Sequence, residues 1–167
     1  MKLVNAIKLS SFALLLVVSP LAFAQAAAPQ TPAAKPAEVF KAADIKAALD
    51  KLAPTSKEKG SGGSVFGDYD THAIQLSLRN ASGGAEIHRH KDDVFFVIRG
   101  SATLITGGTV VDPKEGAGGE IKGTSIKDGV SQTISAGDVV HIPAGTPHML
   151  ILTKGEEFGA VVIKIKE

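Results

Sequence analysis

The 167-residue sequence contains no cysteine and no tryptophan, and it has a single tyrosine. Without cysteine, the chain can form no disulfide and offers neither a thiolate metal ligand nor a thiol nucleophile. With so few aromatic side chains, it has little surface on which a nucleic-acid base could stack. Basic and acidic residues are nearly balanced, 18 against 17, so the charge gives no reason to expect a nucleic-acid partner.

The first 24 residues have the layout of a secretory signal peptide. Two lysines precede an apolar run that ends in the triplet Ala-Phe-Ala at 22–24, so cleavage is expected before Gln25. A membrane anchor is the alternative, but Pro20 interrupts the run, which is shorter than the roughly 20 residues of a spanning helix. Cleavage removes two lysines and no acid, which leaves 16 basic and 17 acidic residues. We therefore expect a periplasmic or secreted protein with no membrane segment after cleavage.

The rest of the chain divides into a tether, a helix and one domain. Residues 25–37 are rich in alanine and proline, which predicts a flexible tether. Residues 38–54 place apolar side chains at helical spacing up to Pro54, which predicts one short amphipathic helix, docked on the following domain or on a partner. The glycine-rich stretch 57–64 is expected to be a loop or hinge. Residues 60–167 suffice for one domain with a single core.

The pattern of this domain is that of β-strands separated by glycine-rich turns. Apolar and polar residues alternate at 72–80 and 159–167, and a β-rich run covers 93–106. Such a pattern is typical of an all-β sandwich or barrel. The polar, glycine-rich segment 107–131 is expected to be a long excursion between two strands.

The stretch that begins at Glu86 combines histidines, acids and an apolar run. Side chains two positions apart share a face of a strand, so Glu86, His88 and His90 are expected on one face. If the two residues after His90 form a tight hairpin turn, His90 lies opposite Asp93. In the same register His88 lies opposite Phe95. Two imidazoles and a carboxylate then converge, and a divalent cation is the simplest partner for such a cluster inside a barrel.

A second stretch delivers a further histidine. Pro143 ends a strand because it cannot donate to the ladder, and Gly145 permits the tight turn that follows. His148 then begins the next apolar strand, from which it can return to the mouth of a barrel. His141 and His72 lie outside this pattern and are expected to be structural or exposed.

The two stretches resemble the paired motifs of the cupin superfamily, whose members fold as a small jelly-roll barrel, the double-stranded β-helix. The family motifs are Gly-x5-His-x-His-x3–4-Glu-x6-Gly and Gly-x5-Pro-x-Gly-x2-His-x3-Asn. The matching positions here are His88, His90, Asp93 and Gly100 in the first motif, and Gly137, Pro143, Gly145 and His148 in the second. The resemblance covers about residues 64–167. It implies an all-β cupin barrel, preceded by one helix, in which His88, His90, Asp93 and His148 bind one divalent metal ion.

The sequence departs from the family pattern at three positions. Asp93 stands where the family has Glu, after a shorter loop, so its carboxylate reaches less far. A three-histidine site with Asp93 outside the coordination sphere is therefore an alternative. The opening glycine is displaced, to Gly83 or Gly84, and Leu152 stands where Asn is usual.

Glu86 is the candidate catalytic residue, because it is expected to share a face with both histidines without filling a ligand position. A partly desolvated carboxylate near a metal ion can act as a general base. The alternative is a salt bridge at the barrel rim with Arg79 or Arg99. The motifs do not select among Fe, Mn, Ni, Cu and Zn, because imidazole and carboxylate donors suit all of these metals.

Two classes of function follow from the resemblance. The first is a metal-dependent enzyme of the dioxygenase or lyase type, acting on a small polar or carboxylate-bearing molecule at the open metal positions. The second is a non-catalytic module that holds a metal or small ligand, with the helix mediating assembly. Cupin barrels commonly pair through edge strands, so a homodimer is expected.

Overall fold

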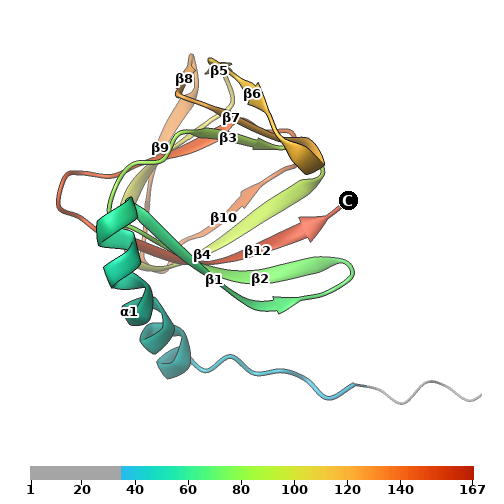
Figure 1. The fold of residues 1–167 in the computed structure, drawn as a ribbon, viewed down its shortest axis with the longest axis vertical. Helices are drawn as coiled ribbons and strands as arrows, with labels where there is room; N and C mark the ends of the chain where they lie inside the picture. The colour runs from blue at the N-terminus through green and yellow to red at the C-terminus, as the bar shows by residue number, and fades with distance from the viewer. Residues whose placement is uncertain (1–34) are drawn as a thin grey trace, which may run out of the picture. The chain divides into compact units, whose positions relative to one another are not determined.

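A computed structural model describes residues 35–167 (Figure 1). The predicted signal peptide (1–24) and most of the predicted tether (25–37) lie outside the described residues. The elements are α1 (Ala42–Lys59), β1 (Ser61–Asp68), β2 (His72–Arg79), β3 (Ala85–His88), β4 (Lys91–Thr106), β5 (Thr109–Val111), β6 (Lys114–Glu115), a 3-10 turn (Ala117–Gly119), β7 (Glu120–Gly123), β8 (Ser125–Lys127), β9 (Val130–Ser135), β10 (Val139–Ile142), β11 (His148–Ile151) and β12 (Phe158–Lys166). Within this range, no helix is long and apolar enough to cross a membrane.

Two antiparallel sheets share the long strand β4. Its first half lies between β12 and β10, and β12 continues this first sheet to β2 and β1. Its second half lies between β9 and β11, and this second sheet continues through β3 and β7 to β6. The two sheets bury one core between them, with Phe95 and Phe158 from the first sheet and Leu104 and Leu150 from the second. The all-β barrel preceded by one helix is thus confirmed.

Strand β4 passes from one sheet to the other at Gly100. This glycine has φ +69°, and a Cβ added to it would lie 1.7 Å from the carbonyl oxygen of Glu157. Only glycine fits, because both the conformation and the close approach of the next strand exclude a side chain. The residue that ends the first sequence motif therefore joins the two sheets.

Helix α1 covers the part of the first sheet's outer face that β1 and β2 form. Leu49 of the helix and Leu76 and Leu78 of β2 are almost completely buried against one another. Of the two partners considered for the helix, the domain itself is the one observed. The apolar face of β2 therefore packs under α1, and the opposite face, with Gln75 and Arg79, lines the barrel interior.

The helix boundaries predicted at 38–54 are shifted in the structure. The helix begins at Ala42, and it continues through Pro54 to Lys59. Ser56 stabilises the last turns of the helix against the sheet, because its side chain is fully buried and its hydroxyl donates to the carbonyl of Leu78 at 3.1 Å. Gly60 then ends the helix with φ +82°, the left-handed conformation common after a helix.

Two segments predicted as loops contain regular structure. The stretch 57–64 forms the end of α1 and the start of β1. The excursion 107–131 contains four short strands, and one of them, β7, pairs with β3. This pairing brings the excursion next to the residues predicted as metal ligands.

Candidate metal centre

Strands β3 and β4 do not form the predicted hairpin. β3 pairs with β7 and β11 in the second sheet, whereas β4 begins in the first sheet between β12 and β10. The two residues after His88 therefore carry the chain across the barrel instead of turning it back. As a result His88 lies opposite Glu120 and not opposite Phe95.

His90 lies away from the other predicted ligands. β3 ends at His88, so the strand alternation that places Glu86 and His88 on one face does not extend to His90. Its side chain is exposed. The imidazole packs beside Gly119, where an added Cβ would lie 2.6 Å from His90 Cδ2. The structure therefore does not bring His90 to the cluster.

Glu86, His88 and His148 come together inside the barrel. His148, the first residue of β11, is directly opposite Glu86 of β3, and His88 follows two positions along on the same face. Each side chain offers one ligand atom, and these atoms all lie within 4.8 Å of one another. Both histidines are buried, with His88 7% and His148 5% exposed. This arrangement gives the structure a group of donors that could hold a metal ion.

Both imidazoles are oriented through their Nδ1 atoms. His88 Nδ1 hydrogen-bonds to Glu120 Oε2, and His148 Nδ1 lies 3.0 Å from the carbonyl oxygen of Thr146. Oxygen acceptors on Nδ1 favour the proton there and leave the Nε2 lone pair as the one that could bind a metal ion, which is the usual arrangement of metal-binding histidines. No local sequence pattern points to Glu120, because this residue reaches His88 only through the pairing of β7 with β3.

The turn before His148 accounts for the second sequence motif. Thr146 donates its N–H to the carbonyl of Pro143 at 3.1 Å, which closes a four-residue turn. Gly145 is the third residue of this turn and has φ +75°, a position that favours glycine. Its N–H also donates to the carbonyl of His88 at 2.8 Å. The motif thus fastens the strand that carries His148 to the strand that carries His88.

Asp93 reaches the cluster from the first sheet, but a lysine neutralises it. Its side chain is 3% exposed, and its Oδ2 lies 3.3 Å from His88 Nε2 and 3.9 Å from His148 Nε2. Lys164, opposite Asp93 on β12, donates to both carboxylate oxygens at 2.7 and 2.9 Å. The same ammonium lies 3.0 Å from His88 Nε2. Lys164 therefore contacts an atom that a metal ion would need.

These contacts set the charges of the cluster. Burial lowers the pKa of His148, so its imidazole is neutral at physiological pH. Burial acts in the same direction on His88, but the carboxylates of Asp93 and Glu120 outweigh it, and the pKa of His88 lies above its ordinary value. Burial raises the pKa of Asp93, but His88 and Lys164 together hold it below its ordinary value, so Asp93 is ionised. An ammonium can only donate, so in the neutral form of His88 the Nε2 atom accepts from Lys164 and Nδ1 carries the proton toward Glu120.

The donor set fits a divalent transition metal. Two imidazole Nε2 atoms with one carboxylate are ligands that such ions accept, and three protein donors leave coordination positions open. Glu86 has neither of the predicted arginine partners: His88 Nε2 lies 3.9 Å and Lys122 Nζ 4.0 Å from its carboxylate. Arg99 instead bonds Glu157 and Asp50.

Comparisons with known proteins bear on the fold. No protein-family model and no curated protein matches the sequence. One similar solved structure is an uncharacterized conserved protein with a double-stranded β-helix domain from Klebsiella pneumoniae, with TM-score 0.54, 16% identity and coverage of 78% of this chain and 91% of that chain. Others are the DMSP lyase DddQ from Ruegeria pomeroyi (TM-score 0.48, 17% identity, 66% and 49% covered) and the Cnp3 cupin domain from Schizosaccharomyces pombe (0.49, 10%, 65% and 66%).

The match to the Klebsiella protein shows the fold. The chain has the double-stranded β-helix fold, which confirms the fold class predicted from the two motifs. It spans about half the length of the DMSP lyase. At identities of 10–17%, the activities of these proteins cannot be assigned to this chain.

Proposed function

We propose that this protein binds one divalent transition-metal ion through Glu86, His88 and His148, and that it is an enzyme acting on a small carboxylate-bearing molecule. The observation that carries the proposal is the convergence of these three side chains, with their donor atoms within 4.8 Å of one another. Two histidines and one carboxylate are the ligand set of many non-haem iron enzymes, which keep positions open for substrate. Iron is therefore the first metal to test, with manganese, nickel, copper and zinc beside it.

The surrounding residues have distinct roles in this proposal. A bound ion would polarise a substrate oxygen or activate a water molecule. Glu120 and the carbonyl of Thr146 hold the two imidazoles with Nε2 toward the centre. Lys164 lies at the inner end of the site, where its ammonium pairs with the Asp93 carboxylate.

Glu86 has two proposed roles that experiment can separate. As the third ligand, it contributes to metal affinity, so Glu86→Gln loses bound metal. As the general base predicted from the sequence, it is needed for turnover only, so the variant keeps its metal and loses activity. We favour the ligand role, because Lys164 already binds the other nearby carboxylate, that of Asp93.

The test is to purify the protein, determine its metal by elemental analysis, and follow turnover of a panel of small carboxylates under air and under nitrogen. Bound metal with turnover supports the proposal, and a requirement for O₂ assigns the dioxygenase type over the lyase type. Protein that takes up none of the five metals would overturn it.

A non-catalytic binding module is the second candidate. The observation in its favour is that Lys164 supplies the cluster with a cation of its own. This alternative expects calorimetric binding of small ligands with no turnover, in metal-loaded and metal-free protein alike.

We also propose that the protein is exported, on the basis of the signal-like residues 1–24. Fractionation of cells expressing the full chain, followed by N-terminal sequencing, tests this. The expected product lies in the periplasm or medium and begins at Gln25, and an uncleaved cytoplasmic protein would contradict it.

A further inference from the structure

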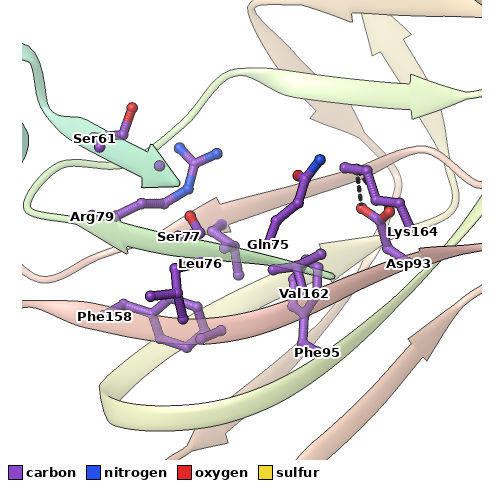
Figure 2. Close-up of a pocket in the computed structure, with 14 residues that line it drawn as sticks. Ser61, Gln75, Leu76, Ser77, Arg79, Asp93, Phe95, Phe158, Val162 and Lys164 are labelled. Atoms are coloured by element: carbon purple, nitrogen blue, oxygen red, sulfur yellow. Dashed lines mark hydrogen bonds and ion pairs between the residues drawn. The ribbon is translucent and has the colours of Figure 1, made fainter. Parts of the chain in front are cut away.

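A cavity of about 240 Å³ lies inside the barrel, and one of its ends borders the candidate metal centre (Figure 2). Asp93 and Lys164 line this end, and both also contact His88. Arg79 lines the cavity from the end of β2. In Figure 2 the side chain of Gln75 lies between Arg79 and the Asp93–Lys164 pair.

Arg79 differs from the other arginines of the chain. The sequence has three, and two of them bond carboxylates: Arg89 with Glu115 at 2.5 Å and Arg99 with Glu157 at 2.8 Å. Within residues 35–167, Arg79 has no carboxylate within 4.0 Å and no hydrogen-bond partner for its guanidinium. Charged side chains in protein interiors are normally paired. A half-buried guanidinium that faces a cavity without a partner therefore indicates an anion that binds from outside the chain.

The charges around the cavity select the ligand's charge. Lys164 and Asp93 form a close ion pair and cancel one another, so Arg79 contributes the one net positive charge. A monoanion balances it, whereas a phosphate dianion would carry a second negative charge for which the lining residues offer no second free cation. The planar guanidinium also matches a carboxylate through two parallel hydrogen bonds.

The walls and length of the cavity select the ligand's body. The β2 wall carries Gln75 and Ser77, whereas Phe95, Phe158 and Val162 form an apolar wall. Arg79 pairs with Phe158, and Lys164 pairs with Ala73. The two pairs are six residues apart along β2, which corresponds to about 20 Å of strand. An elongated molecule suits this space better than a compact one.

We infer that this cavity is a binding site for a linear monocarboxylate of medium chain length, with its carboxylate on Arg79 and its hydrocarbon chain along the apolar wall. The far end of such a molecule points toward Lys164 and the metal centre. Its role as the substrate rests on the function proposed above, whereas its binding does not.

Isothermal titration calorimetry on chelator-treated protein tests the inference, with butanoate, hexanoate and octanoate as probes. Affinity should rise about fourfold for each methylene group, the gain expected for burial of a CH₂, until the cavity is filled. Arg79→Met should weaken hexanoate binding at least tenfold. Arg89→Met, which removes an exposed arginine, is the matched control and should bind as the parent does. Hexanamide, the uncharged analogue, should bind the parent at least tenfold more weakly than hexanoate.

The outcomes separate this inference from the proposed function. If Arg79→Met does not fold, Arg79→Lys and the hexanamide comparison still report on the carboxylate contact. Hexanoate binding that is the same in Arg79→Met and the parent, or absent from the parent at millimolar concentrations, would overturn the inference. Protein that binds hexanoate through Arg79 but takes up no metal would support it and remove the proposed function. Metal uptake without hexanoate binding would do the reverse.

Discussion

Lys164 places an ammonium group inside the barrel, beside the candidate metal ligands. Its Nζ lies 3.0 Å from His88 Nε2 and within 2.9 Å of both oxygens of Asp93. Because the inner face of β12 is formed by Phe158, Ala160 and Val162, Lys164 follows the same parity into the interior. A metal ion bound through His88 has to displace this ammonium. The lysine and the metal are therefore expected to compete.

Replacement of Lys164 by Met should raise metal affinity about tenfold, since a hydrogen bond to a charged group no longer has to be broken and Asp93 becomes a further donor. Competition with a coloured chelator measures the dissociation constant. Lys166→Met is the control, because Lys166 bonds Asp68 on the exposed side of the sheet. Equal affinities in the two variants would show that Lys164 does not hinder the metal.

The same substitution leaves the Asp93 carboxylate without its cation in the metal-free protein, which lowers the free energy of unfolding. Addition of metal should raise the free energy of unfolding of Lys164→Met again.

Among the elements, strand β4 depends most on a single residue. Gly100 is required both by its φ of +69° and by the approach of the Glu157 carbonyl. Gly155 offers a matched position, with φ +87° and no atom within 4 Å of an added Cβ. The two glycines therefore separate conformational strain from steric exclusion.

Gly100→Ala should lower the free energy of unfolding by more than about 3 kcal/mol or prevent folding, because strain and a backbone clash add. Gly155→Ala should cost only about 1–2 kcal/mol, the cost of the left-handed conformation. Urea unfolding followed by circular dichroism measures both. Similar losses in the two variants would contradict the role of Gly100 at the junction between the sheets.

Helix α1 contributes to the hydrophobic core of the domain, so truncation of its buried side chains should lower the stability of the fold. Leu49 is completely buried, and Leu49→Ala should destabilise the fold by about 2–5 kcal/mol. Val39, 76% exposed, is the control, and Val39→Ala should change stability by less than about 0.5 kcal/mol. If both variants unfold at the same urea concentration as the parent, α1 is not docked as described.

The sequence predicted which segments form strands and turns better than it predicted which strands pair. Gly145 and His148 could be placed because turn chemistry is local, and the structure keeps both in those roles. The hairpin after His90 was wrong because a two-residue connection can either reverse a strand or carry it to the facing sheet, and sequence does not distinguish these cases. Glu120 and Lys164 were missed for a related reason: each reaches the site through long-range pairing, which no local pattern reports.

At the scale of the whole molecule, exposed apolar side chains lie on the outer face of the first sheet, and we propose them as the contact of the predicted homodimer. Phe96 and Ile98 of β4 are 39% and 42% exposed, and Val139 of the edge strand β10, opposite Phe96, is 62% exposed. We expect two copies to pair here. Phe96→Asp should then halve the mass measured by sedimentation equilibrium, whereas Val130→Asp, at another exposed apolar residue, should leave it unchanged. A monomeric parent protein would rule the pairing out.

The metal content of three alanine variants compared with the parent tests the whole account most directly. His88→Ala and His148→Ala remove donors that the fold brings together from two sheet strands, whereas His90→Ala removes an exposed ring beside Gly119. After identical loading and desalting, we expect near-stoichiometric metal in the parent and in His90→Ala, and little in the other two. Loss of metal from His90→Ala, or full retention in His88→Ala, would contradict the site described here.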